Sequence, residues 1–267
     1  MPHHAVTTSR SDQATTNDAF LDGRIRVLQP KSGPRTAIDA LFLAAAVPAV
    51  SGASQRVLEA GAGSGVVSLA LCARVEDVRV TGVETQSGLC ELARENAVLN
   101  AMDDRLVFLE GDVTACWEQL EGSGLKRENF DHVVANPPFF NDDNVRRPAN
   151  AAVAKAHSFP PDDLEKWVRF LATTAAPHGT ITMIHRPEAL RELLILLEGR
   201  FGALKVFPLF PKRNSRASRV LVQGTKASRA PLELLAGMVL HEDDGNYTTR
   251  AQAILRDAAG LDLDAVT

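Results

Sequence analysis

The stretch Asn136-Pro137-Pro138-Phe139 contains the residue types that can hold and activate a flat amino group. An amino nitrogen conjugated with a ring or a carbonyl is a poor nucleophile, because its lone pair is delocalised. The side-chain oxygen of Asn136 and the carbonyl oxygen of Pro137 can each accept one N–H from it. The two prolines fix the turn, and the Phe139 ring offers a surface for stacking. These residues predict attack by an amino nitrogen on an electrophilic carbon, with no metal and no covalent nucleophile, although a bare NPPF is also compatible with a loop capped by a packed aromatic ring.

A glycine-rich turn comes earlier in the chain, between a predicted strand and a predicted helix. It reads Glu59-Ala-Gly61-Ala-Gly63-Ser-Gly65. Glycines at this turn allow the backbone to approach a nucleoside closely, although a tight strand-to-helix connection would also use them. A dinucleotide fingerprint requires Gly or Ala at Val66, which disfavours NAD. The carboxylate of Glu59 suits the cationic sulfonium and ammonium groups of S-adenosylmethionine, which is therefore the predicted cofactor and methyl donor.

Two further acids end the next two predicted strands. Glu84 follows the glycine turn at the distance typical of a carboxylate that accepts both hydroxyls of a ribose. Asp112, after Gly111, is expected to meet the adenine edge of the same cofactor. Glu84 alone is equally compatible with a solvated loop acid, and the joint spacing with the glycines supports the binding role.

Short β-branched runs alternate with longer helical patterns from Arg56 onward, which is typical of βαβ units. The fold class predicted is a Rossmann-like α/β domain with a seven-stranded, mostly parallel sheet, helices on both faces and an antiparallel C-terminal hairpin. The expected strands are 56–60, 78–83, 105–110, 130–135, 179–185, 204–210 and 218–226, and the expected helices between them are 66–75, 87–100, 113–122, 162–176 and 187–201.

The N-terminal part is predicted to form a flap. Asp22-Gly23 between apolar stretches indicates a hairpin turn, and the apolar run 38–50 is too short for a bilayer and predicts a buried helix that begins near Thr36. We expect a disordered leader over residues 1–17 and a single domain over 18–267. Within that domain, 18–50 form the flap and helix, 56–140 the cofactor-binding half and 141–267 the substrate-facing half.

The composition favours a globular enzyme over a non-specific nucleic-acid binder. The chain has 267 residues, of which 45% are hydrophobic and 23% charged, and its net charge is −4. Any contact with RNA is therefore expected to be local. The three cysteines form no CxxC pair. Together with the lack of a secretory signal, they predict a cytoplasmic protein without a disulfide framework or membrane segment.

The motifs EAGAGSG, VTGVE, GD and NPPF resemble those of amino-methylating class I methyltransferases. Their flanks extend the resemblance to about Asp18–Gly260. The segments DGRIRVLQPKSGPRTAIDALFLAAAV, HRPEAL, PKRNSRASRVLVQGTK and PLELLAGMVLHEDDGNYT look like those of the bacterial family that methylates adenine N6 in valine tRNA. The resemblance implies methylation of an adenine beside the anticodon. Many members have Tyr where this chain has Phe139, an exchange that keeps stacking and loses a hydroxyl.

The resemblance also implies that the segment before the first strand closes over the methionine end of the cofactor. In this chain that role would fall to Arg35, Thr36 and Asp39. Arg35 and Asp39 are equally compatible with a structural ion pair.

RNA contacts are predicted from basic and aromatic residues outside these motifs. The segment 200–230 contains eight Lys and Arg residues and no acid. Such a segment can bind phosphates, although a solvated positive face gives the same pattern. The candidates for RNA contact are Phe140, Arg146, Arg147, Lys212, Arg213 and Arg216.

Two other functions remain compatible with the sequence. The same chemistry would serve a guanine N2 of ribosomal RNA or a glutamine amide of a protein, and the flanking segments favour tRNA. A module that binds the cofactor or RNA without catalysis is the alternative from another class. The intact Asn136, Pro137, Glu84 and three glycines disfavour it.

Overall fold

A computed structural model describes residues 15–32, 38–138 and 163–265, and its centre is a mixed β-sheet of nine strands. Seven of these strands correspond to the seven predicted ones. Their bounds are β3 (Arg56–Ala60), β4 (Arg79–Glu84), β5 (Leu106–Glu110), β6 (Phe130–Ala135), β7 (Ala175–His185), β8 (Phe201–Phe210) and β9 (Arg219–Lys226). The predicted fold class is confirmed.

The strand order of the sheet is β10-β8-β9-β7-β6-β3-β4-β5, with β11 also paired to β8. Strands β3 to β7 pair in parallel, and β9 runs antiparallel to both β7 and β8. The short strands β10 (Glu233–Leu234) and β11 (Met238–Val239) add two members to the seven predicted. Each has two residues, which is too short for an alternating pattern to appear in the sequence.

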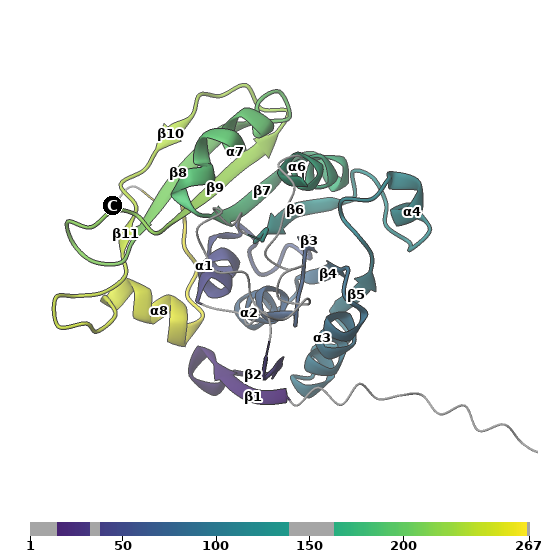
Figure 1. Ribbon diagram of the computed structural model, residues 1–267, viewed down its shortest axis with the longest axis horizontal. Coiled ribbons are helices and arrows are strands. Elements are labelled where there is room, and N and C mark those ends of the chain that lie inside the picture. The colour runs from purple at the N-terminus through teal and green to yellow at the C-terminus, as the bar shows by residue number, and fades with distance from the viewer. Residues whose placement is uncertain (1–14, 33–37, 139–162, 266–267) are drawn as a thin grey trace, which may run out of the picture.

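Helices cover both faces of the sheet, as Figure 1 shows. On one face lie α1 (Asp39–Ala46), α2 (Val66–Arg74), α3 (Ser87–Leu99) and α8 (Thr249–Asp257). On the other lie α4 (Trp117–Glu121), α6 (Asp163–Thr174) and α7 (Leu190–Leu197), with the 3-10 turn η2 (Pro187–Ala189) before α7. Each face has its own apolar cluster, because successive strand residues such as Val57 and Leu58 point to opposite sides.

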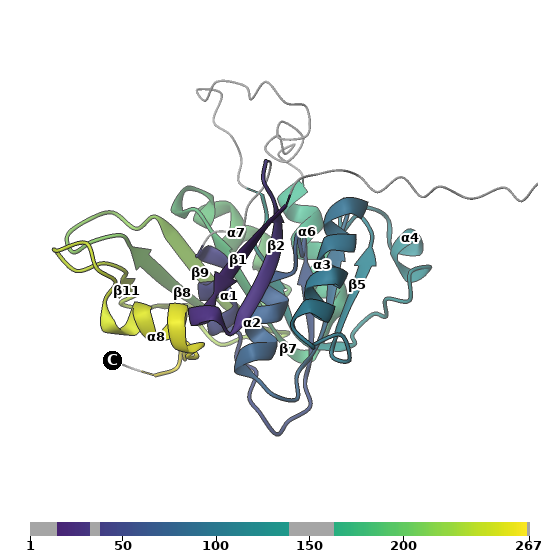
Figure 2. The same ribbon diagram turned by 90° about the horizontal axis from the view of Figure 1, so that it is seen from below.

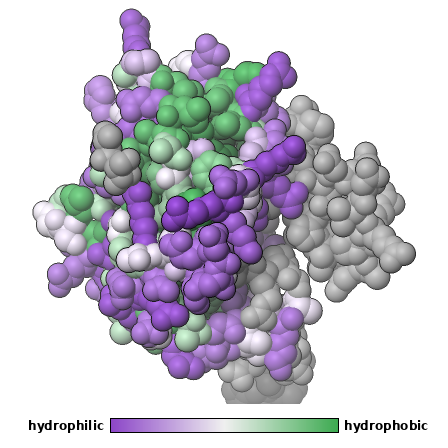
Figure 3. Space-filling view, turned by 90° about the vertical axis from the view of Figure 1, so that its left-hand side faces the viewer, coloured by the Kyte–Doolittle hydropathy of each residue, from purple (hydrophilic) through white to green (hydrophobic). Residues whose placement is uncertain are grey.

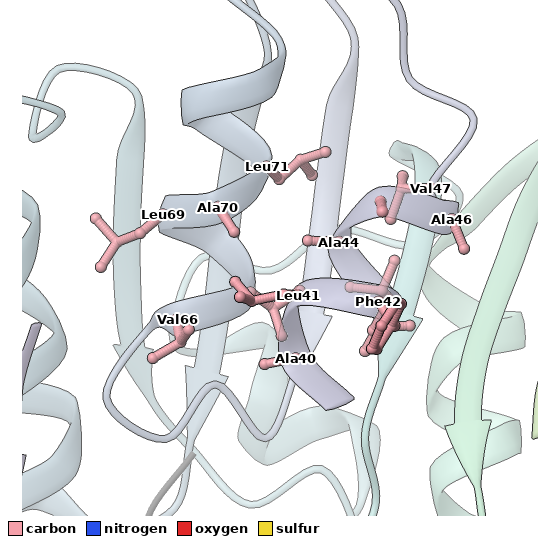
Figure 4. Packing of buried hydrophobic residues seen from close by; sticks show 14 of the residues in the cluster. Ala40, Leu41, Phe42, Ala44, Ala46, Val47, Val66, Leu69, Ala70 and Leu71 are labelled. Carbon is pink, nitrogen blue, oxygen red and sulfur yellow. The ribbon is translucent and has the colours of Figure 1, made fainter. Parts of the chain in front are cut away.

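Helix α1 is the buried helix that its composition predicts. Every residue from Asp39 to Ala46 is buried, so the helix has no polar face. Figure 4 shows α1 and α2 packed side by side, with Leu41 and Ala44 of α1 near Ala70 of α2. The small alanines allow the two helices to approach closely.

The predicted N-terminal hairpin is present. Strand β1 (Thr15–Phe20) pairs antiparallel with β2 (Ile25–Pro30) through the turn η1 (Leu21–Gly23). Strand β1 begins at Thr15, so residues 15–17 are strand and do not belong to the predicted disordered leader. Figures 1 and 2 place the hairpin outside the main sheet, against α2 and α3.

The predicted helix over 113–122 is wrong in its first part. The carboxylate of Asp112 accepts hydrogen bonds from the backbone N–H of Thr114 at 2.8 Å and from its hydroxyl at 2.7 Å. This local turn competes with a helix for the same backbone groups, so α4 begins only at Trp117. Among the residues described, none of the helices combines the length and apolar character that a bilayer crossing requires.

Candidate active site

The predicted site residues of four different strands lie in a row at one edge of the sheet. In the β3–β6 register Ala60 is opposite Ala135, so the glycine loop and Asn136 leave adjacent strands at the same level. In the next two registers Ala60 is opposite Val83, and Glu84 is opposite Glu110. The carboxyl ends of β6, β3, β4 and β5 therefore present Asn136, the glycine loop, Glu84 and Asp112 in that order. This is the edge at which open α/β sheets bind ligands.

The three glycines of the loop all have positive φ, but they have different surroundings. A Cβ on Gly61 (φ +70°) would lie 2.4 Å from the Trp167 ring, and one on Gly65 (φ +84°) would lie 2.9 Å from Phe108. A Cβ on Gly63 (φ +55°) would meet none of the described atoms within 4 Å. Gly61 and Gly65 thus allow close packing inside the protein, whereas Gly63 borders open space at the carboxyl edge. Gly63 marks where a ligand can approach the backbone.

Glu84 is held against the glycine loop. One carboxylate oxygen accepts the Gly63 N–H at 2.8 Å and the other accepts the Gln86 N–H at 2.9 Å. The residue is 6% exposed. Since each carboxylate oxygen has a second lone pair, these bonds orient the group and leave acceptor capacity for the hydroxyls of a ribose.

Glu59 lies beneath the loop and is almost fully buried. Its Oε2 accepts hydrogen bonds from the backbone N–H of Ser68 at 3.1 Å and from the Ser68 hydroxyl. Its Oε1 accepts none from the part of the chain that the structure describes. Burial raises the pKa of Glu59 to about 8, and the bonds from Ser68 only partly offset this effect. A cationic ligand nearby would favour the charged form of this carboxyl group.

The Asn136 side chain presents an acceptor that no other described residue uses. Its Oδ1 is shielded from solvent and has no hydrogen-bond partner among the residues that the structure describes. Buried acceptors are nearly always paired, so an unpaired one at a strand end indicates a site that a donor completes. Pro137, which follows, is buried, and Pro138 is half-buried. One N–H of an incoming amino group fits the unused oxygen.

Asp112 is exposed, and its Oδ1 is occupied by Thr114. Its position after β5 matches the prediction, since the Gly111 N–H donates to the Glu84 carbonyl at 2.9 Å. The structure places Asp112 at the end of the row, and its contact with an adenine stays a prediction.

Several predicted residues lie outside the described part of the chain. They are Arg35, Thr36, Phe139, Phe140, Arg146 and Arg147. Asp39 is described, and its carboxylate accepts from Arg219 Nε at 2.6 Å. Arg219 begins β9, so this ion pair joins α1 to the sheet. Asp39 thus forms a structural ion pair, one of the two roles that the sequence left open, and its role at the cofactor stays a prediction.

The basic segment 200–230 is largely neutralised by acids from elsewhere in the chain. Five of its eight cations form ion pairs with acids that the sequence window does not contain. The pairs are Arg200–Glu165 (3.8 Å), Lys205–Asp264, Arg213–Glu242 (3.6 Å), Arg219–Asp39 (2.6 Å) and Lys226–Glu128 (3.0 Å). Lys212, Arg216 and Arg229 have no ion pair with any residue the structure describes.

Figure 3 shows the side of the molecule that carries β8, β11 and α8, where hydrophilic side chains surround a hydrophobic area.

Sequence reasoning missed three residues that shape the site. Ser68 holds Glu59, the Trp167 ring packs against Gly61, and Asn96 donates to the Ser64 carbonyl of the glycine loop at 2.9 Å. The sequence could have indicated Asn96, because it is a polar residue on the apolar face of a predicted helix. The sequence could not have indicated Trp167, since a tryptophan at a core position of a helix usually packs without a special role.

Comparison with known proteins agrees with this arrangement. Residues 36–159 match the family model of the methyltransferase small domain. A tRNA1(Val) (adenine(37)-N6)-methyltransferase of Porphyromonas gingivalis is 28% identical over 202 residues, which cover 73% of this chain and 75% of the relative. The enzyme of the same name from Aeromonas hydrophila is 25% identical over 239 residues, covering 88% and 94%.

Solved structures show the same architecture. A structure named as a predicted O-methyltransferase from Agrobacterium tumefaciens superposes with a TM-score of 0.72 at 28% identity, covering 85% of this chain and all of that one. A S-adenosylmethionine-dependent O-methyltransferase from Thermotoga maritima gives a TM-score of 0.51 at 16% identity, which concerns the fold alone.

Proposed function

We propose that this chain, an S-adenosylmethionine-dependent methyltransferase of the Rossmann-like class, methylates the exocyclic N6 nitrogen of an adenine in a tRNA. The unused Oδ1 of Asn136 carries the proposal. An acceptor at this place serves a substrate that brings an N–H, such as an exocyclic amine, and gives no advantage to one that lacks a donor.

The described residues fit the cofactor. Gly63 leaves open space beside the backbone, Glu84 has acceptor capacity for ribose hydroxyls, and the buried Glu59 can complement a positive charge. S-Adenosylmethionine, when bound, supplies an electrophilic methyl group on a sulfonium. Asp112 at the end of β5, together with Arg35, Thr36 and Asp39 at the N-terminal side, completes the proposed binding set. Asp39 would act there while paired with Arg219.

Asn136 acts on the acceptor nitrogen in this proposal. Its Oδ1 accepts one N–H and the Pro137 carbonyl accepts the other, so both hydrogens lie on one side and the lone pair is directed to the opposite side. The two bonds also stabilise the positive charge that develops on nitrogen during attack. The released proton passes to solvent. Phe139 is proposed to stack on the adenine, with Pro138 fixing the turn.

The relatives support tRNA as the acceptor. Those of P. gingivalis and A. hydrophila are both named for adenine-37 N6 in tRNA1(Val), and the second is aligned over nearly its whole length. Lys212, Arg213 and Arg216 are proposed to contact phosphates, with Phe140, Arg146 and Arg147 on the substrate side. A cytoplasmic location follows from a tRNA substrate and stays a prediction.

The test is methyl transfer by the purified chain to unmodified tRNA, followed by digestion and mass spectrometry of the nucleosides. N6-Methyladenosine in valine tRNA, and its absence from tRNA of a deletion strain, is the expected result. The same assay with ribosomal RNA and a release factor covers the other acceptors. Labelling confined to guanine N2 or to protein rejects the proposal.

The A. tumefaciens structure, named as a predicted O-methyltransferase, makes oxygen the second candidate acceptor. The digest separates the two, because a ribose methylated on oxygen and an adenine methylated on nitrogen differ in their fragment masses. A product methylated on oxygen would mean that the Asn136 oxygen has another purpose.

A further inference from the structure

Asn96 of α3 and Asn100, which directly follows the helix, bind the backbone of β2 at the outer edge of the N-terminal hairpin, as a neighbouring strand would. The Asn96 Oδ1 accepts the Leu28 N–H at 2.7 Å, and its Nδ2 donates to the Leu28 carbonyl at 3.0 Å. Asn100 repeats this pattern on Arg26, at 2.8 and 2.7 Å. Four residues at the helical rise, the separation of Asn96 and Asn100, advance about 6 Å, and two strand residues advance about 6.7 Å, so the two spacings match.

Asn96 differs from Asn100 in making a third bond, which reaches the cofactor loop. The second hydrogen of its Nδ2 donates to the Ser64 carbonyl at 2.9 Å. The same peptide group is fixed at its other end, because the Gly65 N–H donates to the Ala62 carbonyl at 2.8 Å. With the Gly63 N–H held by Glu84, the conformation of the loop around Gly63 depends on both Asn96 and Glu84.

The Asn96 side chain makes its bonds to β2 and to the glycine loop at the same time, and it cannot move to serve one without disturbing the other. The residue is fully buried, and its amide uses the oxygen and both N–H groups in the three contacts. A shift of the Ser64 carbonyl therefore moves the donor that also holds Leu28. Asn100 is half-buried, and its further bond goes to the Asn96 carbonyl within the helix.

We infer that Asn96 is a positioning residue for the cofactor and couples the glycine loop to the N-terminal hairpin. The loop conformation that accepts S-adenosylmethionine keeps the Ser64 carbonyl on Asn96, and the same amide then holds β2. Because coupling is reciprocal, a ligand that stabilises the loop also strengthens the hold on the hairpin. The inference rests on cofactor binding and is independent of which acceptor is methylated.

Hydrogen exchange of the full chain tests the coupling without any substitution. S-Adenosylhomocysteine, the demethylated cofactor, is added, and exchange is followed in peptides that cover 25–30 and 59–68. We expect slower exchange in both segments of the wild type. Protection of the loop with unchanged exchange in the hairpin would overturn the inference, and this measurement holds even where a variant does not fold.

The variants Asn96→Ala and Asn100→Ala form a matched pair, since each removes one bidentate contact with β2 and only the first touches the loop. We expect Asn96→Ala to weaken cofactor binding about tenfold in calorimetry, equivalent to about 1.4 kcal/mol, and to abolish ligand-induced protection of the hairpin. Asn100→Ala is expected to speed basal hairpin exchange and to keep the affinity within about twofold. An equal loss of affinity in both variants would show that loosening the hairpin alone is responsible, and it would also overturn the inference.

Discussion

Replacing Asn136 with alanine is expected to lower turnover sharply without destabilising the protein. The Asn136 Oδ1 makes no hydrogen bond with any described residue, so alanine loses none of those at this oxygen. A buried polar group left unpaired costs about 1 to 3 kcal/mol. Removing it offsets the packing lost by truncation. In the reaction the same oxygen would hold the attacking nitrogen, and loss of one such bond costs about 2.7 to 4 kcal/mol, or roughly 10²- to 10³-fold in kcat.

Three measurements on Asn136→Ala separate this reasoning from a structural role. Thermal unfolding should give a melting temperature equal to or above that of the wild type. Calorimetry with S-adenosylmethionine should give a Kd within about twofold, and single-turnover methylation should show the loss in rate. Asn136→Asp keeps an acceptor at the same position and is the control, for which we expect more activity than for alanine. A less stable alanine variant with weakened donor binding and normal turnover would refute the argument.

The remaining predictions concern the cofactor loop, its buried acid and the RNA-binding cations. Gly61→Ala should have a lower melting temperature than Gly63→Ala, because only the Cβ at position 61 would collide with the Trp167 ring. Gly63→Ala should instead weaken cofactor binding in calorimetry, because it strains the positive-φ backbone where the cofactor approaches. Because the pKa of Glu59 is raised from 4.5 to about 8 in the folded protein, the free energy of unfolding should fall as the pH rises from 4.5 to 8. In the same pH range, binding of a cationic cofactor should ionise Glu59 and release its proton. Affinity for S-adenosylmethionine should therefore rise with pH up to about 8, and Glu59→Gln should remove that dependence in titrations at several pH values. The double variant Lys212→Ala/Arg216→Ala should weaken tRNA binding in filter assays and lower its salt dependence without changing cofactor affinity.

The positions of the site motifs were predictable because they depend on strand ends. Runs of β-branched residues bounded by turns identify the strands, and in a parallel sheet their carboxyl ends share one edge. Asn136, Gly63 and Glu84 therefore came together as the sequence indicated. The identity of the open glycine was not predictable, because Gly61 and Gly65 are distinguished from Gly63 only by the rings that pack on them.

Contacts between distant segments were beyond the sequence. The sequence left Asp39 open between a role at the cofactor and a structural ion pair, and its partner Arg219 is brought close only by the folded sheet. The amide of Asn96 likewise has both of its partners in other segments, β2 and the glycine loop. A sequence pattern can indicate that a polar residue is buried, but it does not identify the groups with which that residue forms hydrogen bonds.

The ion pairs of segment 200–230 limit how much RNA affinity this segment can supply through charge. Each phosphate contact contributes about 0.7 to 0.9 to the slope of log K against log salt concentration. If all eight cations of 200–230 contacted phosphates, the slope would be about −6 to −7, whereas the three without an ion pair to a described residue would give about −2 to −3. Because exposed pairs such as Arg213–Glu242 are worth under about 1 kcal/mol, such a cation can exchange its partner for a phosphate and make the slope somewhat steeper. Hydrogen bonds such as those proposed for Asn136 release no counterions, so the choice of nucleotide should survive at salt concentrations that weaken overall binding.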